Sequence, residues 1–500
     1  MRRAGPLDSA FFGLEAPGHP LHGMAVMVLD PSTVPGGYSF ARLRNFVASR
    51  LPGIPPLRQR SVPLAMGLAK PGWVDSDVDV RDHVFKHVRT GATPADLATY
   101  AAALAAAPLD RTKPLWTMHV IEGLHDGTVA IVAKVHHSLM DGVAGMDFLA
   151  GMFSLHPEAD PAVPVGAGTR RAPNSATRLA LVLPELCTIP ARATQALVKT
   201  GRAGSRLTVL ARRGFLSFPR APRMRWNGEL GPRRVVALAS VPLADVKDVA
   251  HATGGTVNDV VLSVLGGACR AYLEKRGELP DESLVAVVPV STHETATGRH
   301  DGGASAVGDG KGADPERARA RRRRPVSNPA NAVSLMLSAI GTDVPDPLER
   351  LAVVHEAMVG AKRMHDALGP DLLTDWLAIA NPLLLGAAAR AFLGLRLASR
   401  VPVAANVLIS DVPGPLVPLY FGGARLLRLY PLGPVYDSVG LNVTVVSCED
   451  SLGFGLVSSP EVLDDPGALA QGIGEELAAL RLARPARVRS GARRAVPIPP

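Results

Sequence analysis

Two adjacent histidines, His136 and His137, end an apolar, β-prone run and are followed closely by Asp141 and Gly142. Histidine is the side chain best suited to accepting and returning a proton near neutral pH. Histidine and aspartate also ligate metal ions, and a histidine after a strand often does no more than hydrogen-bond in the core. These residues therefore point to a catalytic base, a metal site or a structural histidine pair.

The secondary structure expected around the two histidines argues against one of these three roles. Residues 129–135 are predicted to form a strand, and side chains alternate between the two faces of a strand. If the strand continues through the pair, His136 and His137 point in opposite directions. This argues against one metal site made of both, because ligands must converge on one point. The acid and glycine that follow are typical of a tight turn, before a helix expected over residues 143–153.

The string HHxxxDG at residues 136–142 resembles the motif of the bacterial wax ester synthase/diacylglycerol acyltransferases, within the chloramphenicol-acetyltransferase-like superfamily of CoA-dependent acyltransferases. Further blocks, in the family's order and spacing, extend the resemblance over nearly the whole chain. They are PLDSAFF at 6–12, HGM at 22–24, PPLRQR at 55–60, WVD at 73–75, PLDRTKPLW at 108–116, TVNDVVL at 256–262, SDVPGP at 410–415 and LNVT at 441–444.

The resemblance implies an α/β (α+β) fold with two chloramphenicol-acetyltransferase-like domains, each a mixed sheet flanked by helices. A chain of 500 residues also exceeds one ordinary domain. We expect an N-terminal acyltransferase domain with the HHxxxDG motif at 1–155, a basic, partly helical crossover at 156–228 and a C-terminal acyltransferase-like domain at 229–500. Within the last, residues 293–328 are rich in glycine and then arginine, depart from the family and are expected to form a disordered loop.

The function implied is O-acyl transfer. A long-chain fatty acyl group would move from acyl-CoA to diacylglycerol, giving triacylglycerol, and/or to a long-chain alcohol, giving a wax ester. By carry-over, His137 is the general base that takes the acceptor's hydroxyl proton and returns it to the CoA thiolate, without a covalent acyl-enzyme. His136 and Gly142 support the motif, Asp141 is structural and pairs with an arginine that the sequence does not identify, and Asn258 orients the thioester carbonyl.

No G-x-S-x-G nucleophile elbow is present, and no cysteine has a recognisable catalytic context, which favours direct transfer. Acyl-CoA is then a substrate, and no cofactor or metal is expected. One position departs from the family: Asp411 stands where asparagine is usual. A carboxylate accepts hydrogen bonds but cannot donate as an amide does, which could alter the local turn or the tunnel beside it.

Composition limits the partners and the compartment. Three isolated cysteines indicate a reducing compartment without a disulfide framework. A net charge of +9 could attract anionic lipid headgroups or the phosphates of CoA, and no nucleic-acid partner is expected. The N-terminus lacks the apolar stretch of a signal peptide, and residues 376–397 are too interrupted to span a membrane. We expect a cytoplasmic protein, either free or peripheral on the inner membrane face or on lipid inclusions.

The predicted crossover contains a long apolar-basic segment at residues 177–218. It supports two interpretations: a helical linker packed between the domains, or a face that holds the enzyme to an anionic membrane surface. Its basic residues are Arg192, Lys199, Arg202, Arg206, Arg212 and Arg213.

Two other functions stay open. The chain could be another CoA- or carrier-protein-dependent acyltransferase or condensation enzyme of the superfamily, although the PLW, ND and VPGP blocks without a carrier domain favour the lipid enzyme. It could also be a non-catalytic lipid-binding relative, against which the intact His137 and Asp141 argue. Acceptor preference, acyl chain length and oligomeric state are not determined by these residues.

Overall fold

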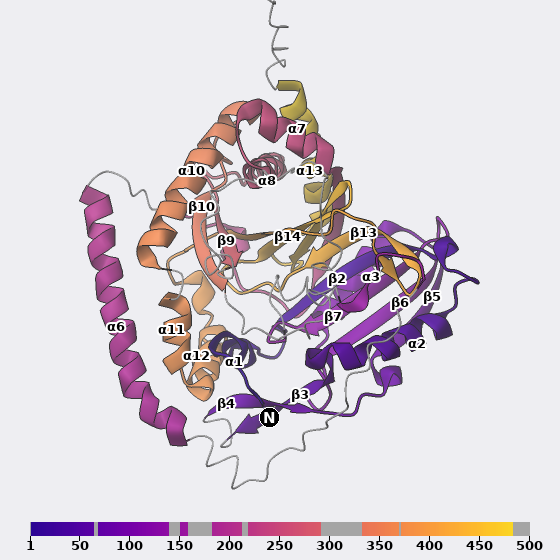
Figure 1. Cartoon of the computed structure of the whole chain (residues 1–500). Coiled ribbons are helices and arrows are strands. Elements are labelled where there is room, and N and C mark those ends of the chain that lie inside the picture. Colours follow the sequence, from indigo (N-terminus) through magenta and orange to yellow (C-terminus); the bar gives the residue numbers. More distant parts are fainter. Residues whose placement is uncertain are drawn as a thin grey trace, which may run out of the picture.

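Two six-stranded mixed sheets form the body of the molecule, and helices cover their outer faces (Figure 1). The mixed sheets with flanking helices confirm the predicted fold class. The computed structural model describes residues 2–64, 69–139, 151–158, 183–212, 219–291, 333–369 and 372–483. Asp141, Gly142, the loop predicted at 293–328 and most of the helix predicted at 143–153 lie outside the described residues.

The first sheet places β7 at its centre, and every residue of this strand is buried. Helix α2 (Phe40–Arg50) packs on one face, and α3 (Pro94–Ala106) packs on the other, between this sheet and strand β8 of the second sheet. The strands, in spatial order, are β12 (Tyr420–Phe421), β13 (Ala424–Leu432), β2 (His22–Asp30), β7 (Val129–His136), β6 (Trp116–Leu124) and β5 (Val84–Ala92).

The second sheet carries a buried central helix, α8 (Val257–Glu274), which lies between α10 (Pro347–Leu368) and α13 (Pro466–Ala483) (Figure 1). Helix α7 (Leu243–Thr253) packs beside α8. The strands, in spatial order, are β10 (Val333–Ala339), β9 (Val285–Ser291), β11 (Val407–Val412), β14 (Leu441–Cys448), β15 (Ser451–Ser458) and β8 (Val235–Pro242).

Strand β13 joins the two halves of the chain. It follows β11 in sequence, yet it pairs antiparallel with β2 of the first sheet, with Leu432 opposite Met24. The same strand packs against β14 and β15 of the second sheet. The sequence division at residue 229 did not foresee that β12 and β13, from the C-terminal part, would complete the N-terminal sheet.

Helix α1 contacts the end of β7, where the histidines lie, and peripheral elements pack around α1. Helix α1 (Pro6–Leu14) packs against α11 (Leu372–Ile379) and α12 (Pro382–Gly394), and it lies near a three-stranded sheet. The strands of that small sheet are β1 (Arg2–Arg3), β4 (Ala69–Asp75) and β3 (Gln59–Leu64).

The long helix α6 (Leu183–Arg212) lies on the outside of the molecule, against α10 and α11 (Figure 1). The break between α11 and α12 falls at Asn381, whose side chain accepts hydrogen bonds from the amides of Leu383 and Leu384 and so caps α12. Among the described residues, none of the helices has the length and apolar character required to cross a membrane.

Candidate active site

The two histidines lie where β7 ends, and both rings pack on α1. The His136 ring stacks on Phe12 with centroids 4.8 Å apart, and the His137 ring stacks on Phe11 at 4.6 Å. Strand β7 ends at His136, and consecutive phenylalanines of one helix hold the two rings. The opposite orientations of the two histidines stay a prediction.

His136 has a structural environment. Its side chain is 1% exposed, and its Nδ1 accepts a hydrogen bond from the backbone amide of Ser138 at 3.1 Å, with the Ser138 hydroxyl at 2.7 Å. Because an amide can only donate, Nδ1 must be the unprotonated nitrogen and Nε2 carries the hydrogen. That Nε2 faces the Glu15 carboxylate at 3.5 Å. These contacts tie His136 to the turn that follows β7.

Glu15 connects several of the predicted blocks. It ends α1, pairs with the Arg111 guanidinium, and its Oε1 lies 3.5 Å from the amide of Leu21. Burial by itself would raise the pKa of Glu15, but its hydrogen bonds and electrostatic interactions with His136 and Arg111 outweigh burial and hold that pKa well below its ordinary value. Glu15 is thus an ionised carboxylate beside the histidine pair, which the sequence reasoning missed because its partners are remote in sequence.

His137 is less enclosed than its neighbour. Its ring is only partly buried, while its backbone amide donates to the carbonyl of Leu21 at 2.9 Å. The residue is therefore fixed on one side by β2 and on the other by Phe11 of α1. A fixed backbone with a partly accessible imidazole is the arrangement that a general base requires.

The other ionisable groups near β7 serve the fold. Burial, with the nearby charge of Lys134, lowers the pKa of His22 well below its ordinary value, so this ring is neutral at pH 7. Burial lowers the pKa of Lys134 to about 8. The Lys134 ammonium donates to the carbonyls of Leu104, at 2.8 Å, and Ala107, where α3 ends, and so caps that helix.

The PLDRTKPLW block makes structural contacts. Its Trp116 is 1% exposed, and the indole nitrogen donates to the carbonyl of Leu57 at 2.8 Å. The block therefore fixes the PPLRQR segment to the first sheet and also supplies Arg111, the partner of Glu15.

The ND block opens α8. Thr256 caps the helix reciprocally with Asp259, whose carboxylate accepts from the Thr256 amide at 2.9 Å. The same carboxylate oxygen lies 2.9 Å from Nδ1 of His355 on α10. Asp259 is therefore a structural cap of α8. Asn258 lies half-buried in the first turn of α8, and its role toward a thioester stays a prediction.

The SDVPGP block begins on β11 and continues past its end. Gly414 donates its amide to the Ser447 hydroxyl at 2.8 Å, and a Cβ added at Gly414 would lie 1.8 Å from the Ser447 carbonyl oxygen. Only glycine permits this approach. Asp411, the departure from the family, is partly buried on β11, and burial raises its pKa to about 6.

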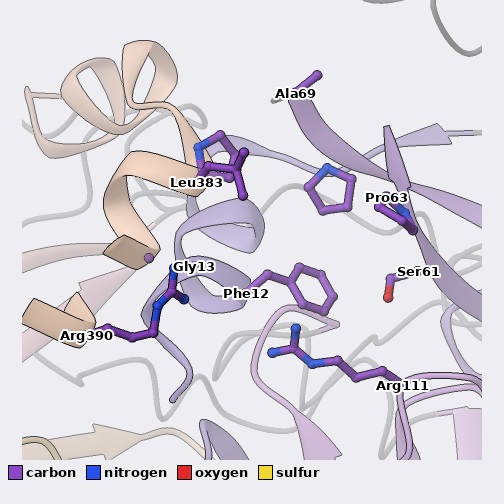
Figure 2. A pocket seen from close by; sticks show the side chains of 11 residues that line it. Phe12, Gly13, Ser61, Pro63, Ala69, Arg111, Leu383 and Arg390 are labelled. Atoms are coloured by element: carbon purple, nitrogen blue, oxygen red, sulfur yellow. The ribbon is translucent and has the colours of Figure 1, made fainter. Parts of the chain in front are cut away.

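A pocket of about 390 Å³ lies between α1, the β3–β4 strands and α12 (Figure 2). Phe12 forms part of its wall, and Arg111 and Arg390 approach from two sides. The sequence reasoning did not predict this pocket, because its walls come from three distant segments. Across the described ranges, no three His, Cys, Asp or Glu side chains gather as a metal site would require.

The fold and these blocks agree with the known proteins that the chain is similar to. A putative diacylglycerol O-acyltransferase of Mycobacterium tuberculosis strain H37Rv is 35% identical over 486 residues, which is 95% of this chain and 89% of the relative. A probable diacylglycerol O-acyltransferase of the same strain is 32% identical over 465 residues, 90% of this chain and 92% of the relative.

Solved structures show the same relationship. The wax ester synthase/diacylglycerol acyltransferase from Marinobacter aquaeolei VT8 is 27% identical, with a TM-score of 0.65 over 96% of this chain and 99% of its own. The first condensation domain of the calcium-dependent antibiotic synthetase, 17% identical over 98% of this chain and 99% of its own with a TM-score of 0.54, shares the fold alone.

The family model for the wax ester synthase/diacylglycerol acyltransferase catalytic domain matches residues 5–261, and the model for the family's C-terminal domain matches residues 330–481. Because the first match alone covers more than half of the chain and includes the histidine pair, this chain belongs to the wax ester synthase/diacylglycerol acyltransferase family.

Proposed function

We propose that this acyltransferase moves a long-chain acyl group from acyl-CoA to the hydroxyl of diacylglycerol or of a long-chain alcohol, with His137 as the general base. The observation that carries the proposal is the partly accessible His137 ring, fixed at the end of the central strand β7 by Leu21 and Phe11. Membership of the family supplies acyl-CoA and an acyl acceptor as the substrate classes.

The proposed reaction proceeds in one direct transfer. The neutral His137 imidazole accepts the proton of the acceptor hydroxyl, and the oxygen attacks the thioester carbonyl. The carbon–sulfur bond then breaks, and the imidazolium returns the proton to the CoA thiolate. No covalent acyl-enzyme forms, so the products are an ester and free CoA-SH.

The residues around His137 have two proposed roles: some position the histidines, and one stabilises the negative charge that develops on the thioester oxygen. Glu15 and Arg111 hold His136, and through it the turn that carries His137. Asn258 is the proposed donor to the thioester oxygen, where an amide would stabilise the developing negative charge. Asp141 keeps its proposed structural role and lies outside the described residues.

Replacing the base tests this function directly. His137→Ala should lower release of free thiol from palmitoyl-CoA by roughly 10²- to 10⁴-fold with either diacylglycerol or hexadecanol, because general-base catalysis is lost. Circular dichroism and palmitoyl-CoA binding should stay those of the wild type. His251→Ala is the matched control, since this exposed histidine lies on α7.

Near-normal turnover by His137→Ala would refute the assignment of the base. Wild-type protein that accepts acyl groups from a carrier protein but not from CoA would instead favour the condensation-enzyme alternative. The acceptor that supports the higher kcat/KM decides between triacylglycerol and wax ester synthesis.

We also propose that α6 holds the enzyme on an anionic lipid surface. Val198, Arg202, Arg206 and Val209 are exposed and share one face of the helix, since they follow at intervals of four, four and three residues. An exposed stripe that combines apolar and cationic side chains suits the boundary between headgroups and acyl chains.

Liposome flotation tests this surface. Arg202→Glu/Arg206→Glu should reduce flotation with anionic vesicles by about tenfold or more, because each cation contributes on the order of 1 kcal/mol near such a surface. The matched control reverses Arg44 and Arg89, which lie on α2 and β5 on the opposite side of the molecule (Figure 1). Equal loss in both double variants, or no wild-type flotation, would contradict the proposal.

A further inference from the structure

Helix α1 contacts both the pocket and the two motif histidines. Phe12 lines the pocket while its ring stacks on His136, and the preceding residue, Phe11, stacks on His137. A ligand in this pocket therefore contacts Phe12, the residue that supports His136 and that directly follows the residue supporting His137.

The walls suit a hydrocarbon chain. The volume of about 390 Å³ lies within the range of small-molecule pockets. Close contact of α1 and α12 bounds it, since a Cβ added at Gly386 would lie 3.0 Å from the Gly13 carbonyl oxygen. The apolar lining residues are Phe12, Pro63, Ala69, Pro71, Pro382 and Leu383.

The charged groups of the pocket are two arginines on either side of Phe12, and Ser61 adds a hydroxyl (Figure 2). Arg111 pairs with Glu15, and its guanidinium lies 5.5 Å from the centre of the Phe12 ring. Arg390 has no ion pair or hydrogen bond with another residue in the described ranges, and its N–H groups stay available to a ligand. Ester carbonyl oxygens are acceptors that a guanidinium can bind.

The pocket wall extends to an apolar part of the molecular surface. On α12, Leu383 is 42% exposed and the next residue, Leu384, is 72% exposed. A ligand that enters past these leucines should be one that dissolves in a lipid surface. Acyl-CoA carries phosphates and a nucleotide that must stay in water, whereas the acyl acceptor carries no such group.

We therefore propose that this pocket binds the hydrocarbon chain of the acyl acceptor, and that Arg390 donates hydrogen bonds to the ester oxygens of a glyceride acceptor. The inference rests on the proposed transferase function and specifies the acceptor site within it. It predicts that diacylglycerol, which has ester oxygens, uses Arg390, whereas a long-chain alcohol does not.

Steady-state kinetics in mixed micelles test the site. Ser61→Leu and Ala69→Leu fill the pocket from β3 and β4, so the apparent KM for diacylglycerol should rise about tenfold, while the KM for palmitoyl-CoA stays nearly constant. Arg390→Leu should raise the KM for diacylglycerol several-fold and leave that for hexadecanol unchanged. Arg400→Leu, an exposed arginine beyond α12, is the matched control.

A rise in the KM for palmitoyl-CoA alone would assign the pocket to the donor and overturn the proposal, as would unchanged kinetics in all three variants. An equal effect of Arg390→Leu on both acceptors would overturn the role given to its guanidinium.

Photo-crosslinking of the unmodified full chain gives a test that does not depend on variant folding. Diacylglycerol with a diazirine in one chain should label peptides from α1, β3–β4 and α12, and excess unlabelled diacylglycerol should suppress the labelling. Labelling without turnover would retain the pocket and reject the proposed function. Turnover with labelling only elsewhere would reject the pocket and retain the function.

Discussion

The two motif histidines differ in the groups that surround them. His136 is enclosed by Phe12, Ser138 and the ionised Glu15, so both of its nitrogens face fixed partners. His137 has a fixed backbone and a partly accessible ring. A base must exchange protons with a substrate, and the partly accessible ring is the better suited of the two for the proposed role.

Asp411 makes stability depend on pH. Burial raises its pKa from 3.8 to about 6 in the folded chain, so the folded state binds more protons than the unfolded state between these values. The free energy of unfolding should therefore fall as the pH rises from about 3.8 to about 6. The Asp411→Asn variant has no carboxylate to ionise at this position, so its free energy of unfolding should not fall in this way. At pH 7.5 this variant should be more stable than the wild type by roughly 1–2 kcal/mol.

Urea denaturation at pH 4 and pH 7.5 measures the effect, and the advantage of Asp411→Asn should shrink at the lower pH. An advantage of the same size at both pH values would show that the amide acts through hydrogen bonding rather than through the removed charge.

At the level of elements, the first turn of α8 carries two neighbouring residues with different proposed roles: Asp259 stabilises the fold, and Asn258 acts on the thioester. Asp259→Ala removes the reciprocal cap with Thr256 and the contact with His355, and should cost about 1–2 kcal/mol of unfolding free energy. Asn258→Ala touches neither contact, and should lower kcat about tenfold or more with little change in stability if its amide donates to the thioester oxygen.

Thermal denaturation and palmitoyl-CoA turnover, measured on both variants, separate the roles. Asp281→Ala is the control for loss of an exposed carboxylate outside any helix. Full turnover by Asn258→Ala would remove Asn258 from the proposed mechanism.

For the molecule as a whole, β13 connects the two sheets, because it pairs with a strand of the first sheet and packs against the second. A Cβ added at Gly453 would lie 2.0 Å from the Leu429 carbonyl oxygen, and one at Gly455 would lie 1.9 Å from that of Pro431. These glycines of β15 let the second sheet approach the strand that completes the first. The two halves should therefore unfold together.

Gly453→Val should destabilise the chain by about 3 kcal/mol, because a branched side chain forces β13 and β15 apart. Gly23→Val, in a strand where an added Cβ would meet nothing within 4 Å, is the matched control. Urea denaturation followed by circular dichroism and tryptophan fluorescence should show one transition in the wild type. Two separate wild-type transitions would contradict the coupling.

The sequence by itself determined the local chemistry. Strand β7 before the histidines, the Thr256 cap of α8 and the break before α12 follow from β-prone runs, capping residues and proline, which act between near neighbours. The motif blocks also indicated the family and the two-sheet fold, because their order and spacing extend along the chain.

Only the tertiary structure decided what surrounds the histidines. Glu15 reaches Arg111 and His136 across about a hundred residues, β13 returns from the C-terminal part to pair with β2, and the pocket has walls from three distant segments. Such contacts depend on how packed elements meet in space, and no local pattern encodes that. The surroundings of His137 were decided in the same way, because α1 supplies the surface on which its ring rests.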